Sequence, residues 1–248
     1  MDTPGQLSGE IARADHQCRP LVPGTAVDWL TEGRYGEALD LGAGTGRFTT
    51  QLLALHRFSR VHAVEPDLRR LTQLHRSCPD ALAAHGSAEI IPLAAASVDA
   101  VFVARTWHWF QTAAAAAEIT RVLRPDGTLG VVWNIRDRTV PWIAQLDDVI
   151  RWPHVPDHEP GTFVVPEGAP FSRPERLVIA WEWTVSAEDF VLSLGTYGHV
   201  LDLPPAERAE LFNAVERFLA DRPELVRGDV IRVPIRTLCY RTHLLACR

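Results

Sequence analysis

The sequence predicts an α/β fold, with a mostly parallel sheet, an antiparallel edge strand and helices on both faces. Its first half alternates short apolar runs with amphipathic stretches, which is the pattern of βαβ units. A cluster of alternating glycines follows the first apolar run, and two further apolar stretches recur near the end of the chain. The 248 residues are enough for one large domain with a sizeable core.

The first half contains five short apolar runs that we expect to form strands, at 38–41, 60–64, 81–85, 98–104 and 128–133. Amphipathic stretches at 47–55, 67–76 and 112–123 predict three helices between them. Asp126 and Gly127 indicate a turn before the fifth strand.

The second half has a different composition, because residues 134–174 are rich in Pro, Trp and His. We expect this segment to form a partly helical excursion over the sheet. A strand at 176–185 would carry Trp181 and Trp183 on one face, and a proline pair opens an amphipathic helix at 204–220. The last strand, 231–242, could pair with 176–185 as an antiparallel edge, although the pattern leaves their order open.

Composition narrows the classes of function. All 25 basic residues are arginine, which we attribute to nucleotide bias, and the net charge of −6 argues against a nucleic-acid partner. No run approaches eighteen apolar residues, so no membrane span is expected. Four dispersed cysteines without a C-x-x-C pair indicate reduced thiols in a cytoplasmic protein. His154, His158 and Glu159 lack the tight spacing of metal ligands.

The most informative stretch is ALDLGAGTGRF, residues 38–48, in which an apolar strand leads through Gly42, Gly44 and Gly46 into a helix. Glycines allow a positive φ and let a ligand approach the backbone. The following helix offers free N–H groups to a polar or anionic group. Glu65, nineteen residues past Gly46, ends the second apolar strand, where a carboxylate can accept hydrogen bonds from ribose hydroxyls.

The spacing of the glycines distinguishes between two classes of nucleotide cofactor. Nicotinamide enzymes use G-x-G-x-x-G, whereas here Asp40 precedes G-x-G-x-G. This turn resembles that of class I S-adenosylmethionine-dependent methyltransferases, which have a Rossmann-like sheet. Residues 86–110 and 118–134 resemble later motifs of the same family. The tail, from Trp181 through residues 231–242, is similar to a bacterial small-molecule branch, type 11-like and related to enzymes that methylate carboxylates such as trans-aconitate.

The resemblance implies one methyltransferase domain over 1–248, with an N-terminal helical lid at 1–34 and a cofactor-binding core at 35–134. A substrate-side insertion with late helices would occupy 135–228, and the final strand 229–248. The cofactor would be S-adenosyl-L-methionine. The residues implied to bind it are Asp40, Gly42, Ala43 and Gly44 at the amino-acid end, Glu65 at the ribose, Pro66, Ser87 and Ala88 at the adenine, and Ala104 and Arg105 at the methionine.

The resemblance is incomplete at the adenine, because many relatives carry Asp where Ser87 stands. The resemblance therefore does not imply that a side chain at this position recognises the adenine amino group.

Methyl transfer from a sulfonium needs alignment more than acid–base chemistry, and a base helps only with a weakly acidic acceptor. His108, in the segment Thr106–Phe110 after the fourth strand, is the candidate base, and packing as a core residue is the alternative. Trp107 could line the pocket or pack the next helix.

Other candidate substrate residues follow the fifth strand or lie in the flanking helical regions. Arg136 suits a carboxylate, although Asp137 and Arg138 lie alongside it and a surface ion pair is at least as much expected. The remaining candidates are Asn134, His16 in the lid, and Tyr197 beside His199.

The expected function is methyl transfer to an O, N or C atom of a small molecule. The sequence leaves open two alternatives: a lyase or cyclase of the same fold that releases methylthioadenosine, or a non-catalytic S-adenosylmethionine-binding protein. We expect a small-molecule partner, no nucleic acid, no membrane, and a monomer or homodimer.

Overall fold

The computed structural model describes residues 18–150 and 162–245, and the chain divides into two compact units. The first, which we call the glycine-turn unit, comprises Leu21–Asn134, Gly161–Ile179 and Thr237–Arg248. The second, the helical unit, comprises Met1–Pro20, Ile135–Pro160 and Ala180–Arg236. Each unit is described by itself below.

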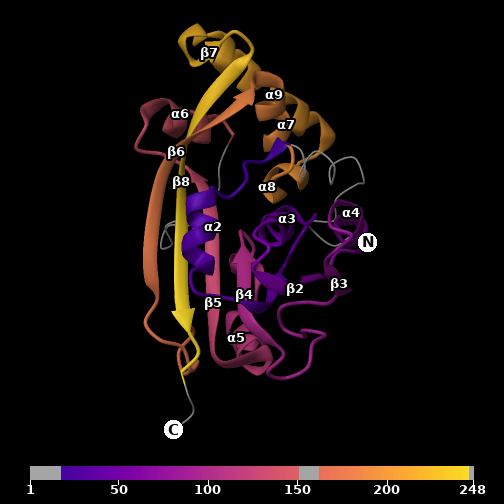
Figure 1. Ribbon diagram of the computed structural model, residues 1–248. Coiled ribbons are helices and arrows are strands. Elements are labelled where there is room, and N and C mark those ends of the chain that lie inside the picture. Colours follow the sequence, from indigo (N-terminus) through magenta and orange to yellow (C-terminus); the bar gives the residue numbers. More distant parts are fainter. Residues whose placement is uncertain (1–17, 151–161, 246–248) are drawn as a thin grey trace. The chain divides into compact units, whose positions relative to one another are not determined.

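The strands form a mixed sheet in the order β3-β2-β1-β4-β5-β8-β6, with the short β7 paired to β8 (Figure 1). The pairs β1–β2, β1–β4, β2–β3 and β4–β5 are parallel, and antiparallel strands complete one edge. This confirms the predicted fold class. The strands are β1 Gly36–Leu41, β2 Phe58–Glu65, β3 Leu82–His85, β4 Val98–Ala104, β5 Leu123–Arg136, β6 Glu175–Ser186, β7 Val226–Arg227 and β8 Val230–His243.

The helices of the described residues connect or follow these strands. None of them combines the length and apolarity that crossing a bilayer requires. The α-helices are α2 Gly24–Thr31, α3 Arg47–Ala54, α4 Leu68–Ser77, α5 Thr112–Val122, α6 Pro141–Val149, α7 Ala187–Leu194, α8 Gly198–Leu201 and α9 Pro205–Ala220, and two 3₁₀ turns are η1 Trp107–Trp109 and η2 Pro223–Leu225.

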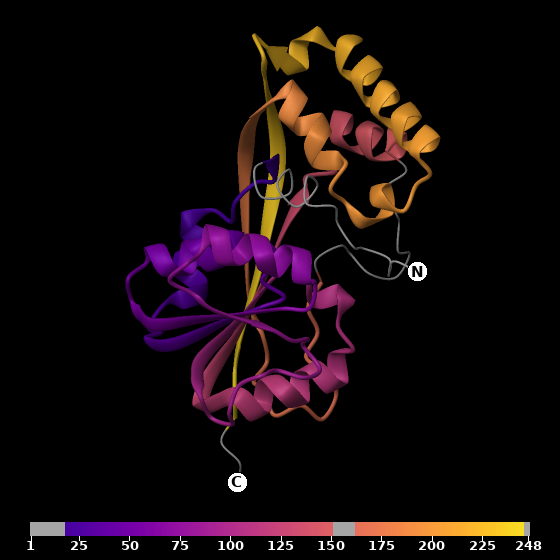
Figure 2. The same ribbon diagram turned by 90° about the vertical axis from the view of Figure 1, so that its right-hand side faces the viewer.

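The core of the glycine-turn unit follows from the alternation of side chains along its strands. Ala38, Ala100 and Phe102 face α2 and α3, which contribute Leu30 and Leu52 to the same buried cluster. Figure 2 shows α5 on the opposite side of the sheet from α2 and α3. Because both faces are covered, the central strands are almost wholly buried, as expected for parallel strands between two helical layers.

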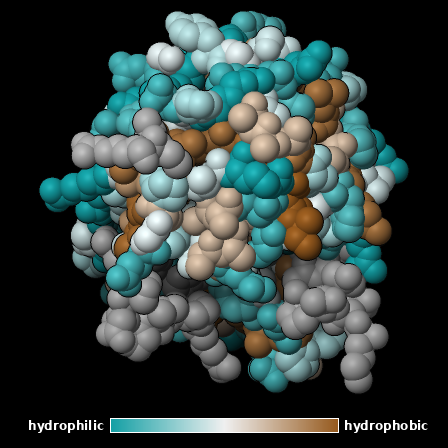
Figure 3. All heavy atoms as spheres, turned by 90° about the horizontal axis from the view of Figure 1, so that it is seen from below, coloured by the Kyte–Doolittle hydropathy of each residue, from teal (hydrophilic) through white to brown (hydrophobic). Residues whose placement is uncertain are grey.

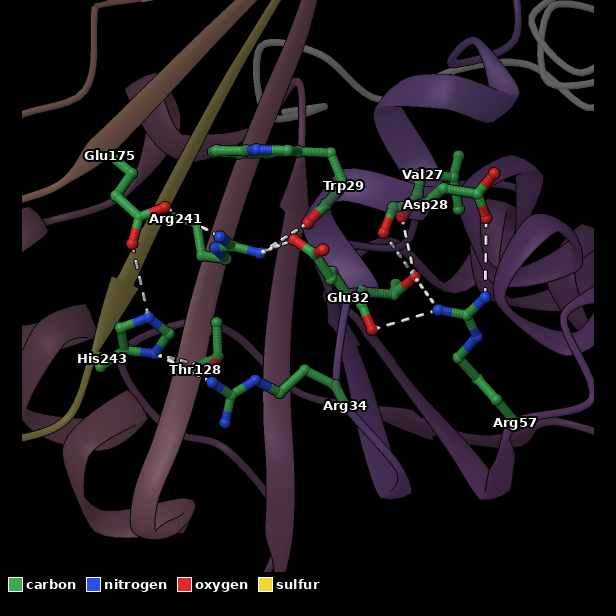
Figure 4. A network of polar contacts seen from close by, with 11 residues as sticks. Val27, Asp28, Trp29, Glu32, Arg34, Arg57, Thr128, Glu175, Arg241 and His243 are labelled. Carbon is green, nitrogen blue, oxygen red and sulfur yellow. Dashed lines mark hydrogen bonds and ion pairs between the residues drawn. The ribbon is translucent and has the colours of Figure 1, made fainter.

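A polar network fastens α2 to the last strand of this unit (Figure 4). The Arg241 guanidinium donates to the Trp29 carbonyl at 2.9 Å, to Glu32 Oε2 at 3.2 Å and to Glu175 Oε2 at 2.8 Å. It also lies 4.6 Å from the centre of the Trp29 ring, within the range of a cation–π interaction.

On the face that Figure 3 shows, hydrophilic residues are interspersed with small hydrophobic groups.

The helical unit has an apolar core of its own. Residues of α6, α7 and α9 pack with inward-facing residues of β8, among them Ile143, Phe190, Val215 and Val233. Ser186 caps α7 by accepting a hydrogen bond from the Asp189 N–H at 2.9 Å, as N-cap serines do. Trp181 and Trp183 lie on one face of β6 and pack against this core, which matches the predicted alternation.

The main difference from the sequence-based expectation concerns β5, which begins at Leu123 rather than at residue 128. Asp126 takes a left-handed conformation, with φ of 62°, which aspartate tolerates better than most residues. The register with β4 shifts between Val98 and Ala100. The Asp126–Gly127 turn is therefore an irregularity within a longer strand.

Candidate functional site

The glycine turn joins β1 to α3 in the glycine-turn unit. The Gly42 and Ala43 N–H groups donate to the Val64 carbonyl at 2.9 and 3.0 Å, so the turn is attached to the end of β2. Gly42, Gly44 and Gly46 have φ of 71°, 61° and 88°, values that most other residues adopt only at a cost. Each glycine is required by the backbone conformation, as the sequence predicted.

The surroundings of the three glycines differ. A Cβ on Gly42 would lie 2.6 Å from Thr106 Oγ1, and one on Gly46 would lie 2.8 Å from Cys78 Sγ. A Cβ on Gly44 would have no heavy atom of the described residues within 4 Å. Gly44 therefore borders open space, where a ligand can approach the backbone closely.

Glu65 lies at the end of β2, beside this open space. Its Oε2 accepts a hydrogen bond from the Gly44 N–H at 2.8 Å, and its Oε1 accepts one from the Asp67 N–H at 3.0 Å. Only 2% of the residue is exposed, and burial raises the pKa of Glu65, with Arg70 and the two backbone donors opposing this. The carboxylate is thus held in one orientation, and its oxygens can each accept a further hydrogen bond.

Asp40 lies in β1, two residues before Gly42, and is fully buried. Its Oδ2 accepts a hydrogen bond from Thr49 Oγ1 at 2.6 Å, whereas its Oδ1 has no hydrogen-bond partner within the described part of the chain. Burial raises the pKa of Asp40 to about 7, and the charge of Glu65 adds to this effect, while Thr49 and Arg105 oppose it. A buried carboxylate with one unsatisfied oxygen is costly, and such a group is typical of a binding site.

The segments after β2 and β3 lie side by side, because Glu65 pairs with His85 in register. The Gly86 N–H donates to the Glu65 carbonyl at 3.4 Å, and His85 Nε2 lies 3.0 Å from the Pro66 carbonyl oxygen. The loop that begins at Gly86 contains Ser87 and Ala88, which form the edge predicted to face an adenine. The structure therefore brings Glu65, Pro66, Ser87 and Ala88 to one edge of the sheet.

The end of β4 supplies the next part of this edge. Ala104 ends the strand, and the Arg105 N–H donates to the Val132 carbonyl at 2.8 Å. Arg105 has a positive φ of 65°, an uncommon and strained conformation for a residue with a Cβ. Thr106 Oγ1 then donates to the Leu41 carbonyl at 3.4 Å, next to the glycine turn.

His108 and its aromatic neighbours follow in the turn η1. The Trp133 Nε1–H points at His108 Nδ1 across 3.5 Å, and burial of part of the ring lowers the pKa of His108. Trp107 is buried, with its ring centre 5.8 Å from that of Phe110 and 4.9 Å from that of Phe163. Trp107 therefore belongs to an aromatic cluster whose other members lie outside α5, the helix that follows.

Two predicted substrate residues have other partners in the structure. Asn134, in the glycine-turn unit, donates from Nδ2 to the Leu21 carbonyl at 2.9 Å and accepts from Thr237 Oγ1 at 2.7 Å. Arg136, in the helical unit, forms a buried ion pair with Asp147, with Nε and Nη2 at 2.8 and 2.7 Å from Oδ1. Arg136 is therefore ion-paired, but in a buried pair with Asp147 rather than in the surface pair that the sequence led us to expect.

Tyr197 also belongs to the helical unit. The Arg19 and Arg136 guanidinium carbons lie 4.3 and 5.6 Å from the centre of its ring, and Arg19 donates to Thr196 Oγ1 at 2.7 Å. His16 lies outside the described residues. The predicted substrate residues are therefore divided between the two units.

Sequence reasoning missed Thr49, Thr106 and Trp133, which contact Asp40, the glycine turn and His108. Thr49 lies in the first turn of the helix after the glycines, so its position could have indicated a partner for Asp40. Thr106 and Trp133 lie next to predicted site residues in sequence, but only the register of β4 and β5 brings them to this edge.

The described residues contain no group of three or more His, Cys, Asp or Glu side chains suited to a metal ion, and His154, His158 and Glu159 lie outside them. A cavity of about 230 Å³ in the helical unit is lined by Val149, Glu207 and Leu211 among others. It includes none of the predicted site residues, and the geometry of the glycine turn is the better guide to function.

Comparison with known proteins agrees with this geometry. Residues 39–131 match a family described as a methyltransferase domain. A curated protein of Mycobacterium tuberculosis H37Rv, called an uncharacterized methyltransferase, is 36% identical over 236 residues, which cover 95% of each chain. One of Schizosaccharomyces pombe, called an uncharacterized methyltransferase-like protein, is 31% identical, over 92% of this chain and 90% of the relative.

A solved structure from Anaeromyxobacter dehalogenans that bears the name of a type II methyltransferase has a TM-score of 0.69. It is 27% identical and covers 92% of this chain and 99% of its own. The fold, the glycine turn and these relatives identify the protein as a class I S-adenosylmethionine-dependent methyltransferase. The chain belongs to the methyltransferase family, and family and fold together support S-adenosylmethionine-dependent methylation.

Proposed function

We propose that the protein binds S-adenosyl-L-methionine at the glycine turn and transfers its methyl group to a small-molecule acceptor. The observation that carries this proposal is the open space at Gly44 beside the fixed carboxylate of Glu65. A nucleoside with a linear amino-acid tail needs these two features, a backbone that it can approach and a fixed acceptor for its ribose.

The chemistry of the residues fits this cofactor. S-adenosylmethionine carries positive charge on its sulfonium and ammonium groups, and Asp40, two residues before Gly42, has an oxygen without a hydrogen-bond partner among the described residues. Gly42, Ala43 and Gly44 would hold the amino-acid end, and Glu65 the ribose. Pro66, Ser87 and Ala88 would border the adenine, and Ala104 and Arg105 the methionine.

His108 would act on the acceptor as a hydrogen-bond donor, and not as the base that the sequence suggested. Because the Trp133 Nε1–H points at Nδ1, the neutral imidazole carries its own proton on Nε2. The lowered pKa of His108 favours this neutral form at pH 7. The Nε2–H could then orient an oxygen or nitrogen acceptor, and the activated methyl group of the cofactor would supply the reactivity.

The charge pattern supports a small acceptor over a nucleic acid, because 31 acids outnumber the 25 arginines. The dispersed cysteines support a cytoplasmic protein. Asn134, Arg136 and Tyr197 remain candidates for acceptor binding, and a relation to enzymes that methylate trans-aconitate remains a prediction.

Glu65→Ala tests the cofactor site. Losing hydrogen bonds to a charged acceptor costs about 1.5–3 kcal/mol, so the Kd for S-adenosylhomocysteine should rise by about one to two orders of magnitude in titration calorimetry. Glu65→Gln keeps one side-chain oxygen, so its Kd should lie between those of the wild type and Glu65→Ala. Glu37→Ala is the matched control, because Glu37 is on β1 of the same sheet and pairs with His62; its Kd should equal that of the wild type.

Two results would contradict the proposal. If a folded wild-type sample does not bind S-adenosylhomocysteine, the proposed cofactor is wrong. Release of methylthioadenosine from S-adenosylmethionine alone, without any acceptor, would replace methyl transfer by cleavage of the cofactor.

A further inference from the structure

The loop that would border the adenine is attached to α5 by one pair of side chains. Arg121 donates from Nη2 to the Ile91 carbonyl at 2.8 Å and from Nη1 to the Leu93 carbonyl at 2.7 Å. Glu118 accepts the Ile91 N–H at 2.8 Å through Oε2. Three backbone groups of the loop are therefore bound by Glu118 and Arg121, which we call the α5 clamp.

The two side chains of the α5 clamp also fix each other. Arg121 Nε donates to Glu118 Oε1 at 2.7 Å, and Arg121 Nη2 donates to Glu118 Oε2 at 2.7 Å. This bidentate geometry is the strong form of an ion pair. The helix that carries the pair is itself firmly packed, since Ala115, Ile119 and Val122 are fully buried. The α5 clamp thus holds the loop against a firmly packed helix.

Contacts within the loop connect the clamped residues Ile91 and Leu93 to Ser87 and Ala88. Ser87 and Ile90 exchange two backbone hydrogen bonds of 3.3 Å, which makes residues 87–90 a tight turn that ends next to Ile91. A Cβ on Gly86 would lie 2.6 Å from Pro92 Cδ, so the two ends of the loop are in close contact. Glu89 Oε1 also accepts the Gln111 N–H at 2.9 Å, ahead of the same helix.

We propose that Glu118 and Arg121 are positioning residues for adenine recognition, holding Ser87 and Ala88 in the conformation that receives the base. This inference rests on the proposed cofactor site. An ordinary surface ion pair would contribute little, but here both members bind the backbone of the loop. Without the clamp, the loop would have to be ordered when the cofactor binds, and the entropic cost would weaken binding.

Arg121→Ala should raise the Kd for S-adenosylhomocysteine about tenfold or more by calorimetry. Hydrogen exchange of the unliganded variant should be faster at residues 86–93 and unchanged on β1 and β2. Arg121→Lys can still reach a carbonyl and should recover part of the affinity, which also guards against a variant that does not fold.

Arg124→Ala is the matched control. Arg124 has the same side-chain exposure as Arg121, 36%, and it also binds a carboxylate, with Nη1 at 2.5 Å from Asp99 Oδ2, but the bonds described for it do not involve the loop. It should leave the Kd unchanged even if its Tm falls as much as that of Arg121→Ala.

A purely structural role for Arg121 would lower Tm and leave the Kd of the folded protein at the wild-type value, and this result would overturn the inference. Exchange at residues 86–93 as slow as in the wild type would also overturn it. Failure of the proposed function is distinguishable, because then the wild-type protein would not bind S-adenosylhomocysteine either.

Discussion

At the scale of single residues, the three glycines of the turn have different physical tasks. Gly42 and Gly46 are needed for packing as well as for their backbone conformation, because a Cβ on Gly42 would overlap Thr106 and one on Gly46 would overlap Cys78. Gly44 faces open space, so only its backbone conformation and a bound ligand would resist a side chain. A substitution at Gly44 therefore separates binding from folding.

Gly44→Ala should lower the free energy of unfolding by only about 1–2 kcal/mol, the cost of a left-handed residue, yet raise the Kd for S-adenosylhomocysteine at least tenfold. Gly33→Ala is the control, because Gly33 also has a positive φ, 66°, and its Cβ position is equally clear of described atoms. Urea unfolding should give similar losses for both variants, and calorimetry should separate them. Equal Kd values for the two would show that no ligand approaches Gly44.

Asp40 gives the unliganded protein a pH-dependent stability. Its pKa rises from an ordinary 3.8 to about 7 on folding, so the folded state holds a proton that the unfolded chain loses at lower pH. A raised pKa means that stability is present below pH 4 and is lost as the pH rises toward 7. The full difference corresponds to roughly 4 kcal/mol at about 1.4 kcal/mol per pH unit.

Asp40→Asn should remove this contribution. The wild type should lose stability between pH 4 and pH 8, and the variant should not lose this part. The difference in the free energy of unfolding, variant minus wild type, should therefore rise over this range by an amount on the order of 3–4 kcal/mol. Urea unfolding at four or five pH values would measure it. Parallel profiles for the two proteins would show that folding does not shift the pKa of Asp40.

At the scale of the elements, most of the glycine-turn unit followed from local patterns. The strand at 98–104 matches β4 residue for residue, and the helix predicted at 47–55 matches α3 within one residue. These elements are bounded by strong local signals, such as the glycines before Arg47. The start of β5 was predicted too late because Asp126 and Gly127 resemble an ordinary loop, and only the pairing with β4 carries the strand through them.

The position of the two late strands could not be predicted from pattern alone. β8 lies between β5 and β6, and the alternation of apolar residues is the same for either order. Long-range contacts determine the order, such as those of Arg241, whose partners Trp29, Glu32 and Glu175 are all far from it in sequence.

Arg241→Met tests the contribution of this network. The Arg241 side chain is 13% exposed, but its acidic partners are 69% and 52% exposed, so solvent screening limits the loss in unfolding free energy to about 1–2 kcal/mol. Arg232→Met breaks a pair exposed by 63% and 58% and should change urea unfolding negligibly. Equal losses in both variants would show that the contacts of Arg241 together add no more than an exposed ion pair.

At the scale of the whole molecule, the sequence predicts that the proposed cofactor residues lie together, but it does not predict the surroundings of the candidate acceptor residues. The candidates for cofactor binding lie at the ends of consecutive parallel strands, which bring them to one edge of the sheet wherever the helices lie. Arg136 and Tyr197 depend on tertiary packing of the helical unit, where Asp147 and Arg19 are their neighbours. No short spacing in the sequence relates those four residues.

Several of the 25 arginines bind partners within the protein. Arg121 and Arg241 bind backbone carbonyls and carboxylates within the glycine-turn unit, and Arg136 forms an ion pair within the helical unit. These arginines serve structure and positioning, so their number does not by itself indicate an anionic partner.

The central claim is that the glycine turn and Glu65 hold S-adenosyl-L-methionine. A crystal structure of the complex with S-adenosylhomocysteine tests it most directly. We predict ribose hydroxyls within hydrogen-bond distance of the Glu65 carboxylate, the amino-acid end over Gly42–Gly44, and the adenine beside Ser87 and Ala88. Density for the ligand elsewhere, or a ribose out of reach of Glu65, would contradict the account.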